Sequence, residues 1–409
     1  MGNGLFITMM GHGHVNPTLG LVKELMARGE KITYIAGFEF EDKIKKIGAE
    51  FVGYENKMNL SNFLSGGKKL SNLQASNIKK EHVEKIGEMM GAQFTEMVEK
   101  VFGLKEKFDY LVYDSSFIIG EEVAKTLKVP AISSTTIFLL NKAILEERPE
   151  ASFMKLGRYV RSGINYDSEN FTNISRKYGV SFESLKDKNR KMANGDLKIV
   201  YTSRYLQPRS EDFDESHLFI GASVGDRNEG LDFSIDKNKK TIYISLGTLF
   251  NKSVEFYKEC IEAFKDMDLN IILSVGKSIN IQETFKDIPK NFIIKNYVSQ
   301  LDVLKETDIF ITHGGMNSTN EGLYFDIPLI FIPQSVDQPF VANRVKELGA
   351  GLVINKDEIS KEKLKESVNI ILENKEFREN SKKIGKSLRD AGGYKKGVDE
   401  ILKLRDSYK

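Results

Sequence analysis

The chain has 409 residues, of which 60 are Lys or Arg and 58 are Asp or Glu, so its formal net charge is +2. This length suffices for two domains of roughly 100–200 residues each, and the nearly balanced charge gives no electrostatic case for binding nucleic acid. A single cysteine, Cys260, excludes a disulfide within the chain and is predicted to be a core thiol, because it shares a helical face with Phe256 and Phe264.

The amino-terminal segment has no basic region and only a short apolar run, so it predicts neither a signal peptide nor a membrane span. No transmembrane segment is expected elsewhere. A cytoplasmic location is the expectation that follows.

Apolar runs of strand length alternate with helical patterns from one end of the chain to the other. In the first half they are Leu5–Met9, Ile32–Ala36, Phe51–Gly53, Tyr110–Tyr113, Ala131–Ser133 and Ile199–Tyr201. In the second half they are Thr241–Ser245, Ile271–Val275, Phe292–Ile294, Ile309–Thr312 and Leu329–Pro333. Because such runs are typical of parallel strands covered by helices on both faces, they predict an α/β protein with two doubly wound, Rossmann-like domains.

The boundary between the domains is predicted from a change in pattern. Residues 211–240 are polar and lack a sustained period, which indicates a linker region. The first domain is then 1–210 and the second is 241–385. Residues 386–409 have a helical pattern and are predicted to form a tail able to pack back on the first domain.

A polar motif follows the strand Leu5–Met9. It reads Gly-His-Gly-His-Val-Asn-Pro, with Asn16 as the expected cap of a helix whose first residue is Pro17. His12 and His14 are therefore expected at the carboxyl end of a strand, where doubly wound folds bind ligands. An imidazole at this place can remove the proton of a bound hydroxyl at neutral pH.

Such a base needs a carboxylate that fixes its tautomer, and Asp114 is the best candidate because it follows the strand Tyr110–Tyr113. Asp109 precedes the same strand and is expected at the wrong end of the sheet. A metal site at His12 and His14 is disfavoured, since no third ligand lies nearby in the sequence.

A second polar motif spans 310–338. It reads as a buried strand, a turn containing Gly314 and Gly315, a helix start at Asn317 and Ser318, and another buried strand. A glycine turn that leads into a helix N-terminus presents backbone N–H groups and the positive end of a dipole. This motif predicts a phosphate site.

The polar residues around this motif extend the prediction from a phosphate to a nucleotide sugar. Glu321, further along the helix, is placed to accept hydrogen bonds from a ribose. Asp337 and Gln338 follow the next strand, where a sugar attached to the phosphate would reach.

The two motifs, His-Gly-Gly-Met-Asn-Ser-Thr-Asn-Glu-Gly with the later Asp-Gln, and Gly-His-Gly-His-Val-Asn-Pro, together resemble the family 1 nucleotide-sugar glycosyltransferases. The similarity is greatest to the bacterial macrolide and flavonoid glucosyltransferases, and it covers nearly the whole chain. It implies the GT-B architecture of two facing domains, with 1–210 binding the acceptor and 241–385 binding the donor. It also implies that His14 is the catalytic base and Asp114 its partner, whereas His12 occupies a variable position.

The resemblance also assigns the donor-binding residues. Tyr297 stands where the family usually has a stacking tryptophan, and this chain contains no tryptophan. Gln300 is expected near the base and ribose, and His313 at the diphosphate. The full donor set implied is Gly247, Thr248, Tyr297, Gln300, His313, Gly314, Gly315, Asn317, Ser318, Glu321, Asp337 and Gln338.

The expected function is inverting, metal-independent transfer of a hexose, above all glucose from UDP-glucose, to a hydroxyl of an apolar small molecule. No cofactor is expected, because the UDP-sugar is a co-substrate. Two D-x-D triplets, 212–214 and 266–268, suggest a metal-dependent transferase but are predicted to be solvated surface. The alternatives are a nucleotide-sugar epimerase, which would not need the Gly-His-Gly-His-Val-Asn-Pro motif with Asp114, and a non-catalytic nucleotide-sugar binding protein, against which the presence of both His14 and Asp114 argues. A lipid is a further class of acceptor.

Overall fold

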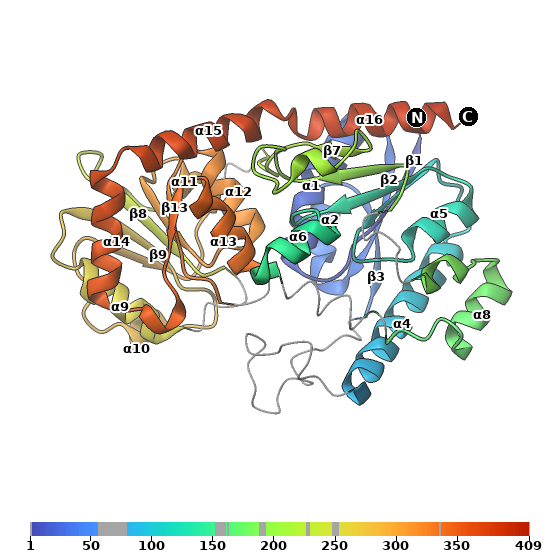
Figure 1. Ribbon diagram of the computed structural model, residues 1–409, viewed down its shortest axis with the longest axis horizontal. Coiled ribbons are helices and arrows are strands. Elements are labelled where there is room, and N and C mark those ends of the chain that lie inside the picture. Colours follow the sequence, from blue (N-terminus) through green and yellow to red (C-terminus); the bar gives the residue numbers. More distant parts are fainter. Residues whose placement is uncertain are drawn as a thin grey trace. The chain divides into compact units, whose positions relative to one another are not determined.

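The computed structural model describes residues 2–55, 80–151, 161, 163–187, 194–225, 230–247, 253–334 and 337–408. The chain forms two compact α/β units, which Figure 1 shows with the helices and strands labelled. The first unit contains Met1–Thr202, Arg209–Ser223 and Gly392–Lys409, and the second contains Ser203–Pro208 and Val224–Ala391. The predicted linker, 211–240, is thus divided between the units at residue 223.

The described part of the first unit contains a seven-stranded parallel sheet in the order β3-β2-β1-β4-β5-β6-β7. Its strands are β1 (Asn3–Ile7), β2 (Lys31–Gly37), β3 (Glu50–Tyr54), β4 (Tyr110–Asp114), β5 (Ala131–Thr135), β6 (Leu197–Val200) and β7 (His217–Phe219). The order reverses between β1 and β4, where Ile7 pairs with Tyr113. Ligands of doubly wound folds bind outside the carboxyl ends of strands at such a point.

Successive side chains of β1 point to opposite faces of this sheet, and on each face they pack against helices. Leu5 and Ile7 share a core with α4 (Lys80–Gly103), α5 (Gly120–Leu127) and α8 (Glu169–Tyr178). Phe6 points to the opposite core, with α1 (His12–Ala27), α2 (Glu41–Lys46) and α16 (Gly393–Ser407). Among the described residues of this unit, the other short helices are α6 (Lys142–Glu147), η1 (Phe38–Phe40), η4 (Pro149–Ala151), η5 (Glu183–Lys186) and η6 (Ser210–Asp212).

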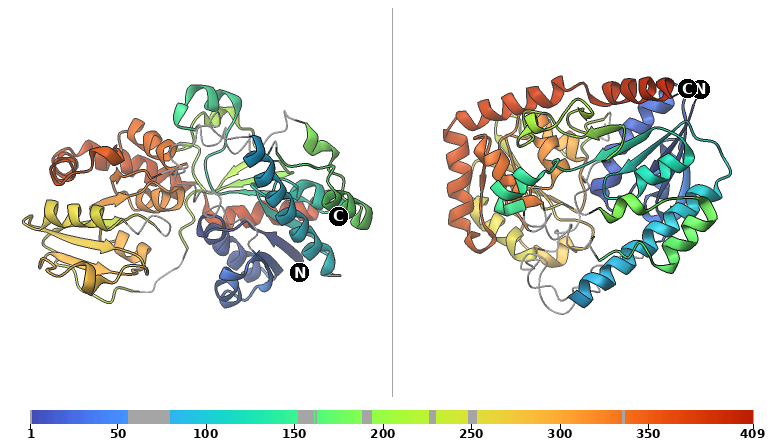
Figure 2. Two further views of the ribbon diagram at one scale, coloured as in Figure 1. Left: turned by 90° about the horizontal axis from the view of Figure 1, so that it is seen from below. Right: turned by 45° about the vertical axis from the view of Figure 1, so that its right-hand side comes forward.

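The carboxyl-terminal helix, α16, belongs to the first unit and packs against α1. Arg405 Nη1 lies 2.6 Å from Glu30 Oε1, which also accepts a hydrogen bond from the backbone N–H of Gly2. Both chain ends therefore lie at the same end of this unit, as Figure 2 also shows. The helical tail divides at residue 391 and not at 385, because α15 (Glu376–Asp390) packs on α12 (Met316–Tyr324) of the second unit.

The described part of the second unit contains a six-stranded parallel sheet in the order β10-β9-β8-β11-β12-β13. Its strands are β8 (Lys240–Ser245), β9 (Leu269–Ser274), β10 (Phe292–Lys295), β11 (Ile309–Thr312), β12 (Leu329–Phe331) and β13 (Gly351–Val353). Its helices are α9 (Val254–Phe264), α10 (Ile281–Thr284), α11 (Gln300–Leu304), α12 (Met316–Tyr324), α13 (Gln338–Glu347), α14 (Lys361–Glu373), α15 and η7 (Lys356–Glu358). The strand order repeats the reversal of the first unit, here between β8 and β11.

The two faces of this second sheet are covered by different helices. Ile242 and Ile244 share a core with α9 and α14, and Cys260 is fully buried in it, which confirms the predicted core thiol. On the other face, Tyr243 stacks on Phe310 with their ring centroids 4.9 Å apart. Helix α12 packs on this face so closely that a Cβ atom at Gly322 would lie 3.0 Å from the Phe310 ring.

Helix α1 begins at His12, so the expectation that it starts at Pro17 is wrong. Gly11 adopts φ = 117° and its carbonyl accepts the N–H groups of His14 and Val15, which starts the helix before Asn16. Pro17 then lies inside the helix, at a position where it lacks an N–H for the helical ladder.

Strands β7 and β13 were not expected from the sequence. Each has only three residues and lies at the edge of its sheet, so its conformation depends on pairing with the neighbouring strand.

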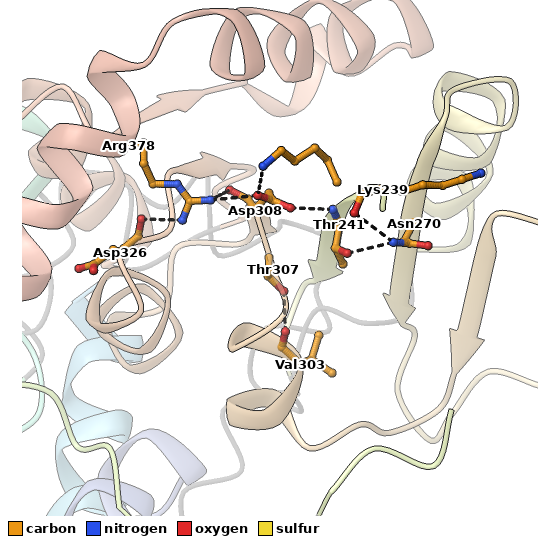
Figure 3. Close-up of polar contacts among 9 residues, drawn as sticks. Lys239, Thr241, Asn270, Val303, Thr307, Asp308, Asp326 and Arg378 are labelled. Carbon is orange, nitrogen blue, oxygen red and sulfur yellow. Dashed lines mark hydrogen bonds and ion pairs between the residues drawn. The ribbon is translucent and has the colours of Figure 1, made fainter. Parts of the chain in front are cut away.

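A polar cluster ties α15 to the amino ends of the strands in the second unit (Figure 3). Arg378 donates to the carbonyl oxygens of Asp326 and Asp308 over 3.0 and 3.2 Å. The Asp308 carboxylate in turn accepts from Lys240 Nζ and from the backbone N–H of Thr241, each over 2.9 Å. The cluster therefore joins the helix to the starts of β8 and β11.

Replacing Arg378 with alanine is expected to lower the free energy of unfolding of the second unit by about 1–3 kcal/mol, because carbonyl groups lose their donor. Urea unfolding measures this loss. The control is Lys382→Ala in the same helix, where the exposed ion pair with Glu379 contributes little to stability. Equal effects of the two changes would show that the cluster adds no more than a surface ion pair.

Candidate active site

In the first unit, His14 and Asp114 meet at the point where the strand order reverses. His14 lies in the first turn of α1, the helix that follows β1, and Asp114 is the last residue of β4. His14 Nδ1 and Asp114 Oδ2 are 2.6 Å apart, with 32% of the histidine side chain exposed and only 2% of the aspartate. The structure thus brings together the two residues that the sequence nominated.

The hydrogen bonds of Asp114 determine the tautomer of His14. The second carboxylate oxygen, Oδ1, accepts the backbone N–H of Ser116 over 2.7 Å. Because an ionised carboxylate only accepts hydrogen bonds, Nδ1 of His14 carries the proton in this pair. Nε2 is then the nitrogen of the neutral ring that has the basic lone pair, as a general base for a hydroxyl requires.

His12 has different partners from His14. Its ring meets the Phe40 ring edge-on with centroids 5.1 Å apart, and its Nδ1 lies 3.3 Å from Lys43 Nζ. Burial, and then the charge of Lys43, lower the pKa of His12. Asp109 accepts the backbone N–H of Asn3 at the amino end of β1, so it lies at the wrong end of the sheet, as expected.

In the second unit, the expected donor residues follow the carboxyl ends of four strands. Gly247 follows β8, Tyr297 follows β10, His313 follows β11, and Asp337 follows β12. Thr248 lies outside the described residues. Parallel strands end at one edge of their sheet, so these segments share that edge.

The imidazole of His313 is packed between two glycines. A Cβ atom at Gly247, where φ is +73°, would lie 2.6 Å from His313 Cε1, and a Cβ atom at Gly315 would lie 2.6 Å from Nε2. A larger residue at either position would therefore displace the His313 ring. Burial lowers the pKa of His313 to about 4, although a hydrogen bond to the backbone of Ser245 acts in the opposite direction. The ring is therefore neutral at physiological pH and has a single N–H group.

The turn at Gly314 also touches the start of α13. A Cβ atom at Gly314 would lie 3.3 Å from the carbonyl oxygen of Gln338. Gln338 is buried, and its Oε1 accepts the backbone N–H of Gln334 over 2.8 Å. Asp337 occupies the cap position of α13 without a cap hydrogen bond from its side chain.

Helix α12 begins directly after this turn, with Asn317 and Ser318 in its first turn and no acidic residue there. Its Glu321 is buried and accepts Gln300 Nε2 over 2.6 Å, and Ser318 Oγ lies 3.3 Å from the same nitrogen. The structure therefore joins Gln300, Ser318 and Glu321 in one hydrogen-bonded group. Tyr297 is 61% exposed, as a ring that stacks on a ligand would be.

Sequence analysis did not identify Tyr243 as part of this group. Its hydroxyl lies 3.3 Å from Gln300 Oε1. The available signal is a single tyrosine between two isoleucines of β8, which sequence patterns cannot distinguish from an ordinary core residue.

The D-x-D triplets lie outside these groups. Asp212 pairs with Arg209, Asp214 with His217, and Asp268 with Lys239. Each partner is local or on the protein surface, in agreement with the expected solvated positions.

Known proteins that are similar to this chain over nearly its whole length are glycosyltransferases. The UDP-glucosyltransferase YojK of Bacillus subtilis is 38% identical over 98% of this chain and 97% of its own length. The NDP-glycosyltransferase YjiC of the same organism is 33% identical over 97% of this chain and 95% of its own length. Residues 258–390 match the C-terminal domain of the erythromycin biosynthesis protein CIII-like family.

Among solved structures, the calicheamicin glycosyltransferase CalG4 superimposes with a TM-score of 0.80 at 24% identity, covering 99% of this chain and 98% of that one. With two doubly wound units and these relatives, the chain belongs to the family 1 UDP-dependent glycosyltransferases of GT-B architecture. Within the described residues, no helix is both long and apolar enough to span a membrane.

Proposed function

We propose that this glycosyltransferase moves glucose from UDP-glucose to a hydroxyl of an apolar small molecule, with inversion at the anomeric carbon and without a metal ion. The observation that carries the proposal is the 2.6 Å contact between His14 and Asp114. It supplies an oriented base for an acceptor hydroxyl, which a protein that only binds nucleotide sugars does not need.

The stereochemical part rests on the chemistry of this base. His14 Nε2 takes the proton of the acceptor hydroxyl, and the hydroxyl oxygen forms a bond to the anomeric carbon as the bond to the UDP oxygen breaks. Asp114 stabilises the imidazolium that forms. A single displacement of this kind inverts the configuration, because attack comes from the side opposite the leaving group.

The donor part rests on the second unit. The backbone N–H groups of Gly314 and Gly315 and the first turn of α12 would offer donors to a departing diphosphate, and His313, packed between Gly247 and Gly315, would contact it as well. Glu321 would accept from the ribose, Tyr297 would stack on the uracil, and Asp337 with the amide group of Gln338 would hold sugar hydroxyls. With these donors present, a bridging metal and a separate cofactor are unnecessary.

The acceptor class is proposed from the relatives. The oleandomycin glycosyltransferase of Streptomyces antibioticus is 26% identical over 95% of this chain. Two fungal sterol 3-beta-glucosyltransferases match at 22% identity, and this chain spans about a third of their length. A hydroxylated natural product is therefore the first acceptor class to test, and a sterol is the second.

With UDP-glucose and a panel of phenols, hydroxylated macrolides and sterols, we expect β-glucoside formation that persists in EDTA. Mass spectrometry detects the product, and the proton coupling of its anomeric centre gives the stereochemistry. Loss of activity in EDTA with recovery in Mn²⁺ or Mg²⁺ would contradict metal independence. Conversion of the donor sugar without any acceptor product would favour an epimerase.

A further inference from the structure

Tyr243 connects the core of the second unit to the group formed by Gln300, Ser318 and Glu321. It lies in the middle of β8, is 1% exposed, and stacks on Phe310. Its hydroxyl lies 3.3 Å from Gln300 Oε1, whereas Gln300 Nε2 lies 2.6 Å from Glu321 Oε2. The two ends of one amide thus join a rigid core tyrosine to a carboxylate at the edge of the sheet.

The direction of these hydrogen bonds follows from the chemistry of the groups. An ionised carboxylate only accepts, so the nitrogen of the Gln300 amide must face Glu321. Oε1 of the same amide then faces Tyr243, and only the phenolic O–H can donate to it. The side chains of Ser245 and Ser274 also interact with this hydroxyl and can donate to its oxygen, which leaves the Tyr243 proton for Gln300.

Tyr257 provides an internal comparison. It is a fully buried tyrosine of α9 in the same unit, and among the described residues its hydroxyl has no hydrogen-bond partner. A buried phenol in this unit therefore does not have to be tied to a polar group. The contact between Tyr243 and Gln300 is a specific feature of this edge of the sheet.

We propose that Tyr243 is a positioning residue that orients Gln300 and, through it, Glu321, so that the donor site selects ribose over 2′-deoxyribose in the nucleoside diphosphate. This inference rests on the proposed function, in which Glu321 accepts from the ribose hydroxyls. A carboxylate whose direction is fixed bonds well to a hydroxyl at one place. When that hydroxyl is missing, the buried acceptor loses a partner, and binding weakens.

The test compares the dissociation constants of UDP and 2′-deoxy-UDP by calorimetry for the parent chain, Tyr243→Phe and Tyr257→Phe. The parent is expected to prefer UDP. Tyr243→Phe should weaken UDP binding about three- to tenfold and reduce the preference by a similar factor, because one neutral hydrogen bond of the relay is lost. Tyr257→Phe should leave both constants unchanged, since its hydroxyl bonds to nothing in the described residues.

A purely structural role of Tyr243 would lower the thermal midpoint without changing the ratio of the two constants, and that result would overturn the inference. Glu321→Ala separates this failure from that of the proposed function. If Glu321→Ala abolishes the preference for UDP over 2′-deoxy-UDP and Tyr243→Phe does not alter it, Glu321 contacts the ribose but Tyr243 does not position it. If Glu321→Ala also leaves the ratio unchanged, the ribose assignment fails and the inference fails with it. In the double variant, Tyr243→Phe should add nothing to the effect of Glu321→Ala on the ratio, because the tyrosine acts through the carboxylate.

Discussion

Replacing His14 with alanine is expected to lower turnover by about two to four orders of magnitude, the usual contribution of a general base. In the proposed mechanism the imidazole, held 2.6 Å from Asp114, is the group that takes the acceptor proton. UDP binding should persist, because His14 belongs to the first unit and the donor residues belong to the second. Initial rates with a saturating acceptor, together with UDP titrations, measure the two effects separately.

Because His14 is paired with Asp114, a change at Asp114 is also expected to lower turnover. Asp114→Asn keeps the shape of the side chain but removes the charge that stabilises an imidazolium, so it should lower the same rate. The two losses should be strongly non-additive in the double variant, because the residues act as one unit. A phenol of low pKa, which is already partly ionised, should suffer least from either change.

His12→Ala is the matched control for His14→Ala. His12 contacts Phe40 and Lys43, so its loss should reduce turnover far less than the loss of His14. If His14→Ala retains normal transfer to an aliphatic alcohol, or if the losses at His14 and Asp114 simply multiply, the relay is wrong. His12 would then be the base to test.

Replacing Asp337 with alanine is expected to reduce the catalytic efficiency with UDP-glucose by about 10- to 150-fold, which corresponds to about 1.5–3 kcal/mol for a hydrogen bond to a charged group. The affinity for UDP should barely change, because UDP lacks the glucose that Asp337 is proposed to hold. Asp337 makes no cap hydrogen bond to α13, so the helix loses at most the small benefit of a negative charge near its N-terminus.

Two further variants serve as controls for Asp337→Ala. Asp337→Asn keeps hydrogen-bonding atoms of the same shape and should retain more activity than the alanine variant. Glu347→Ala, at the other end of α13, removes a half-exposed carboxylate and should have no effect on either ligand. Equal weakening of UDP and UDP-glucose binding by Asp337→Ala would move this residue out of the sugar site.

The sequence by itself was sufficient for the architecture and for the places of the polar motifs. Buried parallel strands are continuous apolar runs, so the interior strands of both sheets appear directly in the sequence, as β1, β8 and β11 do. The carboxyl ends of such strands are where doubly wound folds bind ligands, so residues that follow them, such as His14 and His313, could be nominated without coordinates.

Tertiary structure decided how these residues are held. The start of α1 at His12 depends on the positive φ of Gly11, which no capping pattern indicated. The edge strands β7 and β13 are too short to be recognised before they pair with their neighbours. Only packing shows that the His313 ring fills the space above Gly247 and Gly315.

The role inferred for Tyr243 has the same origin. In the sequence it is one aromatic residue of a strand, and its hydroxyl gains the inferred role only because the fold places β8 beside the first residue of α11, Gln300. Periodicity along the chain reports which side chains are buried, since burial is a local property of a strand or helix. It cannot report which polar atoms meet, because those distances are set by the packing of elements that are far apart in the sequence.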